Sequence, residues 1–287
     1  MTILVTGATG TVGRGVVGQL VAAGQHVRAL TRDPAAARLP AEVEVIAGDL
    51  TRPDTMLKAF DGVDRVHYLP TFAVPERTAE LAKSFVHLAE DAGVRRIVCL
   101  SGAAVTIRRA GSYELLHEVE QVIEASGLEW THLRPGEFAV NKLDTWGQSI
   151  RATSVVRNAF PDALGVPIHE ADIAEVAVAA LLEDGHAGRA YTLTGPEALS
   201  HREQAAAIGA GLGRPIRFEA QTYGQSRTAY IEAGLPMEVA EYVLGYQAEY
   251  AEEPPEVSPA FERVTGRPGR TLAQWAADHA AELALTK

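Results

Sequence analysis

The residues with the clearest chemical signature lie near the N-terminus, in the stretch Gly7-Ala8-Thr9-Gly10-Thr11-Val12-Gly13. They follow a short β-branched run and precede a helical pattern. Spaced glycines between a strand and a helix are typical of a dinucleotide-binding turn. Gly7 would permit a tight turn, Gly10 would let the backbone approach a pyrophosphate, and Gly13 would let helix and strand pack closely. The motif predicts a dinucleotide-binding site contacted by all of its residues except Ala8. The alternative is a merely structural glycine-rich turn.

The end of the second predicted strand should decide which dinucleotide is bound. The run Leu30-Thr31-Arg32 ends there, and Thr31 stands where enzymes specific for NAD place a carboxylate for the ribose hydroxyls. An arginine at this point can instead accommodate a 2′-phosphate, so Arg32 favours NADPH over NADH. Two alternatives stay open. Asp33 follows one residue later and could select NADH, and Arg32 could be a solvated turn residue.

Two further strand ends are expected to lie against the same cofactor. The third predicted strand closes with Gly48-Asp49-Leu50. Asp49 could accept a hydrogen bond from the adenine amino group while Leu50 flanks the ring, or Asp49 could simply cap the following helix. The fourth strand leads into Tyr68-Leu69-Pro70-Thr71-Phe72. We expect Leu69 and Pro70 to pass over the cofactor and the two residues after them to face the substrate.

The elements that must position these residues follow a regular pattern. Short apolar runs bounded by turn residues alternate with helical patterns, as is typical of strands covered on both faces. The runs are residues 3–5, 27–30, 43–46, 66–69, 97–100 and 131–133. Strands that alternate with helices require crossover connections. We therefore expect an α/β fold with a Rossmann-type, doubly wound parallel sheet.

The pattern changes after about residue 190. A strand-like run at 191–193 precedes a capping box at Ser200 and Glu203, which should open a helix. Further helical stretches at 222–233, 237–250 and 271–285 are separated by Pro and Gly. We expect a NAD(P)-binding Rossmann domain over 1–190 and a small, mostly helical substrate lobe over 191–287. The lobe should share some elements with the first domain and have no independent core.

Composition excludes several classes of function. The 287 residues carry a formal net charge of −11, with no basic patch of the kind that nucleic acid requires. No apolar run is long enough to cross a membrane. The single cysteine, Cys99, lies in an apolar run and is expected to be a core residue. The histidines show no spacing typical of metal ligands. These features predict a cytoplasmic protein that binds neither nucleic acid, membrane nor metal.

Taken together, the motifs resemble the atypical NmrA-like branch of the short-chain dehydrogenase/reductase superfamily. That branch includes type 2 NAD(P)H:quinone oxidoreductases, related azoreductases and redox-sensing regulators. The resemblance covers nearly the whole chain. Besides the glycine motif, it is carried by residues 48–50, 126–135, 138, 141, 169–174, 191–196 and 265–271.

Typical members of the superfamily use Ser, Tyr and Lys to move a proton onto the substrate. The resemblance places these roles at Ser101 and Tyr113, but His117 stands where the lysine is expected. A histidine one helical turn from a tyrosine could hold a proton relay, although it is not a permanent cation at neutral pH. Packing or substrate-lining roles for Tyr113 and His117 stay open. A quinone or conjugated ketone needs less proton transfer and could be reduced mainly by placement against the hydride.

Candidate substrate residues come from loops that leave the sheet. Thr71 and Phe72 follow one strand, and Phe138, Asn141 and Trp146 follow another. In a late helix, tyrosines at 242, 246 and 250 share one face and could bind a flat ring, or pack against the lobe or another subunit. We therefore expect a small, aromatic substrate and either a monomer or a homodimer.

The leading hypothesis is a reductase that transfers hydride from NADPH to a quinone or to an aromatic or conjugated ketone. Such a ketoreductase or quinone reductase could serve secondary metabolism. The first alternative is a redox sensor that binds NADP(H) without turnover and acts through a protein partner. The second is an isomerase or epimerase with tightly held NAD, which would require the missing Tyr/Lys pair.

Overall fold

The computed structural model describes residues 1–109 and 113–285. Two compact units form, and each consists of three segments of the chain. Unit 1 comprises Met1–Gly136, Glu170–Leu193 and Ala260–Gly266; unit 2 comprises Glu137–His169, Thr194–Pro259 and Arg267–Lys287. The chain thus passes repeatedly between the units. The division into domains at residue 190 stays a prediction.

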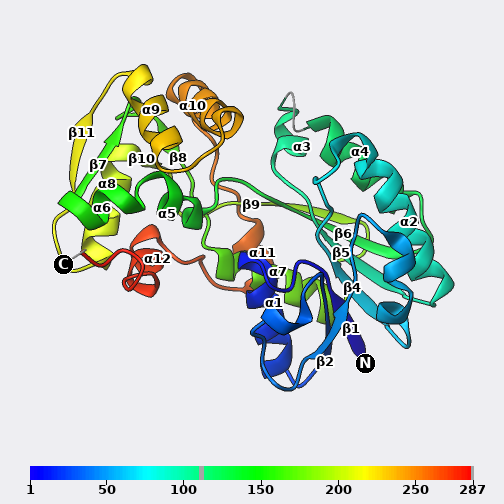
Figure 1. Ribbon diagram of the computed structural model, residues 1–287. Helices are drawn as coiled ribbons and strands as arrows, with labels where there is room; N and C mark the ends of the chain where they lie inside the picture. Colours follow the sequence, from blue (N-terminus) through cyan, green and yellow to red (C-terminus); the bar gives the residue numbers. More distant parts are fainter. Residues whose placement is uncertain (110–112, 286–287) are drawn as a thin grey trace. The chain divides into compact units, whose positions relative to one another are not determined.

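Unit 1 is built on a parallel sheet of seven strands in the order β3-β2-β1-β4-β5-β6-β9 (Figure 1). The strands are β1 Thr2–Val5, β2 His26–Thr31, β3 Glu44–Ala47, β4 Arg65–Tyr68, β5 Arg96–Leu100, β6 Glu129–Pro135 and β9 Arg189–Leu193. Every pair is parallel. The direction of winding reverses between β1 and β4, which is where ligands bind in such sheets. The predicted strands and the doubly wound α/β fold are confirmed.

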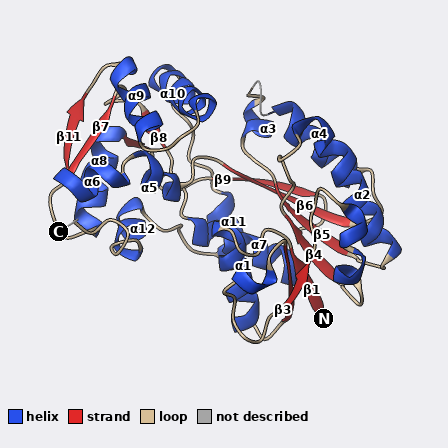
Figure 2. Cartoon of the chain, in the orientation of Figure 1, coloured by secondary structure: helices blue, strands red, loops and turns tan. Residues whose placement is uncertain are grey.

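Helices cover both faces of this sheet (Figure 2). They are α1 Thr11–Ala22, α2 Thr78–Asp91, α3 Ala104–Ile107, α4 Tyr113–Glu124, α7 Glu170–Leu182 and α11 Ala260–Thr265. Helix α1 packs on α7, and α2 packs on α4. Helices α2 and α4 each bury one apolar face, with Leu81 and Phe85 of α2 and Val119 and Ile123 of α4 almost fully covered. Burial of such faces provides the main stabilisation of the sheet and its helices.

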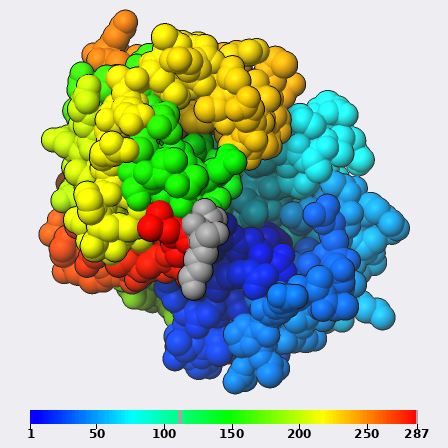
Figure 3. Space-filling model, turned by 60° about the vertical axis from the view of Figure 1, so that its left-hand side comes forward, coloured from blue at the N-terminus to red at the C-terminus, as the bar shows by residue number. Residues whose placement is uncertain are grey.

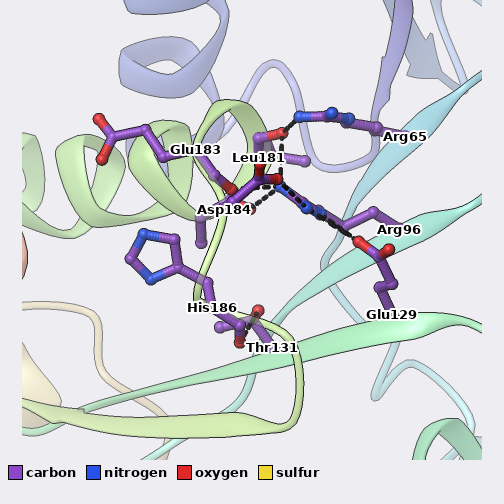
Figure 4. A network of polar contacts seen from close by, with 9 residues as sticks. Arg65, Arg96, Glu129, Thr131, Leu181, Glu183, Asp184 and His186 are labelled. Atoms are coloured by element: carbon purple, nitrogen blue, oxygen red, sulfur yellow. Dashed lines mark hydrogen bonds and ion pairs between the residues drawn. The ribbon is translucent and has the colours of Figure 1, made fainter.

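The C-terminal end of α7 is held by two arginines, Arg65 and Arg96, which are the first residues of the neighbouring parallel strands β4 and β5 (Figure 4). The Arg96 guanidinium donates to the carbonyls of Ala180 and Glu183 and pairs with Glu129 at 2.8 Å. Arg65 donates to the carbonyl of Leu181. The last carbonyls of a helix have no partner within it, and cations there also complement the helix dipole. These contacts fix the end of α7 at the amino ends of the strands. The glycine motif lies at the other end of the sheet, after the carboxyl end of β1.

Unit 2 contains helices of 4 to 16 residues and two small two-stranded sheets. Its elements are α5 Lys142–Thr145, α6 Gly147–Thr153, β7 Val155–Asn158, β8 Leu164–Gly165, β10 Leu199–Ser200, α8 His201–Gly211, β11 Arg217–Ala220, α9 Tyr223–Glu232, α10 Met237–Glu252 and α12 Leu272–Asp278. Strand β7 pairs with β11 in parallel, and β8 pairs with β10 antiparallel. Figure 3 shows residues near 145 and residues after 200 sharing one surface of this unit.

Unit 2 has a hydrophobic core, to which the C-terminal region contributes only one part, so the expectation that this region has no independent core stays a prediction. Trp146, Ile150 and Val156 from the middle of the chain pack with Ile208 and Trp275 from its end in one buried cluster. The C-terminal residues alone would be too few for this core, but residues 137–169 complete it. Close packing of α8 on α12 supports it, because a Cβ at Gly211 would lie 2.1 Å from the Ala273 carbonyl oxygen.

The late helices begin where the capping signals predict. Ser200 and Glu203 form the predicted capping box of α8, and Thr222 and Thr271 head similar boxes with glutamine. Helix α12 ends at Asp278, earlier than predicted, and the strands of the two small sheets were not predicted. In the described part of the chain, no helix is long and apolar enough to span a membrane.

Candidate active site

The glycine motif forms a tight turn between β1 and α1. Gly7 has a φ of +61°, and a Cβ there would lie 2.6 Å from the Leu69 side chain. A Cβ at Gly13 would lie 2.1 Å from the Gly7 carbonyl oxygen, so the helix approaches the turn too closely for any side chain. The Gly10 N–H donates to that carbonyl at 2.9 Å. Glycine is therefore required at both ends of the motif by backbone contact and conformation.

The N-terminus of α1 suits an anion. Gly10 is its N-cap, no side chain caps the helix, and its first turn contains no acidic residue. The first N–H groups of a helix have no partner within it and carry partial positive charge. A twelve-residue helix that begins in a glycine turn presents these donors to a pyrophosphate. The residues present therefore fit a dinucleotide.

Two polar side chains brace the turn. The buried Thr6 hydroxyl accepts a hydrogen bond from the Leu69 N–H at 2.7 Å, which ties the end of β1 to the loop after β4. Arg14 donates to the carbonyl of Thr9 at 2.9 Å and to the carbonyls of Ala37 and Arg38 at 3.2 and 3.0 Å. One guanidinium thus joins the glycine turn to the segment after β2. Both residues position the site, and sequence reasoning missed them.

A cleft of about 540 Å³ opens at the carboxyl ends of β1 to β4. It brings together many of the residues predicted from the sequence to contact the cofactor or substrate, namely Gly7, Thr9, Arg32, Asp49, Leu50, Leu69, Pro70, Thr71 and Phe72. Gly10 and Thr11 are exposed at the turn. Val12 and Gly13 are buried behind it. The cleft residues, with Gly10 and Thr11, can touch a ligand, whereas the buried Val12 and Gly13 shape the turn.

The segment after β2 shows which charged residue faces the cleft. The Asp33 carboxylate accepts hydrogen bonds from the N–H groups of Ala35 and Ala36 at 3.1 and 3.3 Å, as the N-cap of a short 3-10 turn. Arg32 lines the cleft. One oxygen of the carboxylate that could have selected NADH is thus used locally, and Arg32, which lines the cleft, can meet a 2′-phosphate.

Asp49 has a local role beside its place in the cleft. Its Oδ1 accepts from the Thr51 N–H at 2.9 Å and from the Thr51 hydroxyl at 2.8 Å. The N–H of Thr51 lowers the pKa of Asp49, so this carboxylate is ionised at neutral pH. Oδ1 closes a local turn with Thr51, but it does not cap the helix that follows, because the short 3-10 helix Pro53–Thr55 has Arg52 as its N-cap and no side-chain cap. Contact with adenine through the other oxygen stays a prediction.

Ser101 lies directly after β5 and belongs to a buried polar network. Its hydroxyl donates to Glu120 of α4 at 2.5 Å. Arg134 of β6 donates to the same carboxylate from Nε at 3.0 Å. Burial raises the pKa of Glu120, but the hydrogen bonds from Arg134 and Ser101 outweigh it and lower the pKa overall. The single hydroxyl proton of Ser101 is thus committed to Glu120, which leaves its oxygen to accept hydrogen bonds.

Tyr113 and His117 lie together in the first turns of α4. Their rings stack with centroids 4.8 Å apart and an interplanar angle of 19°. Stacking brings the two π faces together, and in the described part of the chain no hydrogen bond joins the phenol to the imidazole. The catalytic roles of Ser101, Tyr113 and His117 stay predictions, and this geometry does not assemble them as a proton relay.

The other predicted substrate residues lie in unit 2. Asn141 and Trp146 line a pocket there with Tyr242 and Tyr246. Trp146 is only 2% exposed and packs mainly in the core of the unit. Phe138 forms an isolated strand-like bridge with Ile168. A substrate role for these residues stays a prediction.

Among the described residues, one group could offer ligand atoms to a metal ion. Oxygens of Glu120 and Glu124 and a nitrogen of His132 lie within 4.8 Å of one another. Arg134 already pairs with Glu120, and such a cation competes with any metal. The sequence did carry a signal for the role of Glu120. Its charged side chain lies on the same helix face as the apolar residues 116, 119 and 123, so it is expected to be buried and to need a partner.

A protein-family model described as NAD(P)H-binding matches residues 7–184. The chain is 40% identical over 285 residues to (4-alkanoyl-5-oxo-2,5-dihydrofuran-3-yl)methyl phosphate reductase of Streptomyces griseus, covering 97% of this chain and 98% of that protein. It is 38% identical over 286 residues to the NAD(P)H azoreductase of Xenophilus azovorans, again covering 97% and 98%.

The fold is shared with a solved structure of the NADPH-dependent quinone oxidoreductase QOR2 from Escherichia coli in complex with NADPH. The TM-score is 0.81 at 24% identity, with 96% of this chain and 99% of that chain covered. The glycine turn, the open helix N-terminus and the cleft thus occur in a chain whose family is described by NAD(P)H binding.

Proposed function

From the premise that the chain belongs to the NAD(P)H-binding family, we propose that it is an NADPH-dependent reductase of quinones or of aromatic and conjugated ketones. We place it in the NmrA-like branch of the atypical short-chain dehydrogenases/reductases, a proposal that the shared fold supports. The named relatives are reductases and an azoreductase, and they support the proposed reductase activity. A small aromatic molecule is the substrate class that we favour, and the cytoplasm, where NADPH is supplied, is the expected location.

One observation carries the choice of NADPH. Arg32 lines the cleft beside the glycine turn, while Asp33 is not among the lining residues and its Oδ1 accepts from two N–H groups of the following turn. A guanidinium forms strong, charge-assisted hydrogen bonds with a phosphate, and NADH offers no phosphate at this position. A free carboxylate at the same point would instead favour the ribose hydroxyls of NADH.

Catalysis would depend mainly on holding the acceptor against the hydride of NADPH. NADPH supplies the hydride when it is bound. The cleft residues Thr71 and Phe72, which follow the loop over the cofactor, would orient the acceptor. Reduction of a quinone places the developing negative charge on an oxygen that is already well stabilised, so a strong general acid is not essential. The occupied Ser101 hydroxyl and the stacked Tyr113 ring agree with this mechanism.

The test is NADPH oxidation against a panel of quinones and aromatic ketones, followed optically with the purified chain. We expect turnover with at least one class of acceptor and slower turnover with NADH. The non-catalytic sensor is the second candidate, and the unassembled Tyr113–His117 pair is the observation that favours it. It predicts similar affinities for NADPH and NADP⁺ by calorimetry and no NADPH consumption with any acceptor.

A further inference from the structure

Unit 2 contains a pocket of its own with a volume of about 190 Å³. Glu137, Lys142 and Trp146 line it together with Tyr242 and Tyr246 of α10. An apolar cavity of about 150 Å³ in another protein is enough to bind benzene. The pocket therefore has room for a single ring. It lies wholly within unit 2, so its ligand can be studied without the cofactor.

A buried ion pair lies in the wall of this pocket. Lys142 Nζ is 2.6 Å from a Glu137 carboxylate oxygen, and the two side chains are only 4% and 9% exposed. The same ammonium lies 4.4 Å from the centroid of the Trp146 ring. Removal of both charges from water costs free energy that the pair alone often does not recover. A buried pair that faces a cavity is therefore better explained by a ligand than by stability.

The hydrogen-bonding capacity of the pair defines the ligand. Lys142 has three donors, of which one goes to Glu137 and another direction is covered by the indole ring. Glu137 has oxygen lone pairs beyond the one used by Lys142. A hydroxyl group can accept from Lys142 and donate to Glu137 at once. A carbonyl could only accept, and a carboxylate or phosphate would be repelled by Glu137.

The rest of the pocket favours an aromatic ring behind that hydroxyl. The Tyr242 and Tyr246 rings lie edge to face with centroids 5.9 Å apart, and Val239 and Val243 of the same helix complete an apolar wall. Aromatic rings pack well against such walls. Burial, with the nearby Glu137 carboxylate, raises the pKa of Tyr246, so its phenol stays neutral.

We propose that this pocket binds a single phenolic ring, with the ring against Tyr242 and Tyr246 and its hydroxyl between Lys142 and Glu137. The inference goes beyond the proposed reductase activity, because it concerns binding to unit 2 and holds whether or not hydride is transferred. It also gives a ligand-binding role to two of the three tyrosines that share a face of α10, Tyr242 and Tyr246.

The experiment titrates the full chain, without cofactor, with three probes of similar size: 4-methylphenol, toluene and 4-methylbenzoate. Ligand-observed NMR supplies the dissociation constants. We expect 4-methylphenol to bind at least about tenfold more tightly than either of the others, since one charge-assisted hydrogen bond accounts for a factor of that order. The double variant Glu137→Gln/Lys142→Met should reduce this preference to less than about twofold.

Two further variants keep the test decisive. Glu219→Gln removes an exposed ion pair with Arg157 elsewhere in unit 2 and should leave binding unchanged. Val239→Trp should fill the pocket and abolish binding of all three probes, and it serves if the double variant fails to fold. Equal binding of 4-methylphenol and toluene, tighter binding of 4-methylbenzoate, or no binding of 4-methylphenol would overturn the proposal.

Discussion

At the scale of single residues, selection of the cofactor depends on two neighbouring side chains with different tasks. Arg32 lines the cleft, and Asp33 caps the turn that follows. We predict that Arg32→Leu lowers kcat/KM for NADPH by about ten- to a hundredfold, the range expected for loss of a charge-assisted hydrogen bond. The value for NADH should change by less than about threefold, because that cofactor has no 2′-phosphate.

Steady-state kinetics with both cofactors checks this prediction. Asp33→Asn is the matched control, since an asparagine oxygen can still cap the turn. It should leave the preference for NADPH in place. An equal loss with both cofactors in Arg32→Leu would mean that the arginine supports the loop rather than the phosphate.

The proton donor gives a second prediction at this scale. A general acid contributes about a hundred- to ten-thousandfold to a rate. Because Tyr113 is stacked on His117, we expect Tyr113→Phe to retain quinone reduction within about threefold of the parent. Rates measured at saturating NADPH test this, with His117→Phe as a companion that keeps the stacked aromatic pair. A loss of a hundredfold or more in Tyr113→Phe alone would identify the phenol as the acid.

At the scale of elements, the glycine turn and the N-terminus of α1 pack together and are expected to bind the cofactor phosphates jointly. A Cβ added at Gly13 would meet the backbone of the turn, whereas a Cβ added at Gly18 in the same helix would meet no atom within 4 Å. We predict that Gly13→Ala weakens NADPH binding at least about tenfold, because the helix must move from the turn that cradles the phosphates. Gly18→Ala should bind normally and be more stable by up to about 1 kcal/mol.

Calorimetric titration with NADPH and thermal melts of both variants provide the comparison. The two substitutions add the same methyl group to the same helix, so they differ only in what that group meets. Unchanged NADPH affinity in Gly13→Ala would show that the close approach of helix and turn is not what holds the cofactor.

At the scale of the whole molecule, buried histidines link stability to pH. Burial lowers the pKa of His67, His132 and His201 from 6.5 to about 4. Each ring is neutral in the folded chain but takes up a proton in the unfolded chain below pH 6.5. The unfolded state therefore binds more protons, and the free energy of unfolding should fall as the pH drops from 6.5 toward 4.

Urea unfolding at pH 7 and pH 5 measures this effect. Each histidine contributes a slope of up to about 1.4 kcal/mol per pH unit in that window. His67→Gln, if folded, should reduce the slope by one histidine's share, while substitution of the exposed His26 should not. The same stability at both pH values in the parent would contradict the argument.

The strands and the glycine turn of unit 1 could be predicted from the sequence because their signals are local. Glycine spacing, apolar strands and capping residues such as Ser200 act on their immediate neighbours. The rest depends on distant pairs that a single sequence does not reveal. The pairing of Arg134 with Glu120 and the completion of the core of unit 2 by residues 137–169 are set by the three-dimensional path of the chain.

The central claim is that the chain transfers hydride from NADPH to a quinone or an aromatic ketone. The most direct test measures NADPH consumed and acceptor reduced in the same anaerobic reaction, with the parent protein in catalytic amount. We expect equal molar quantities of each over many turnovers, and faster reaction with NADPH than with NADH. Tight binding of NADPH without its consumption, across the whole panel of acceptors, would contradict the claim and support the sensor.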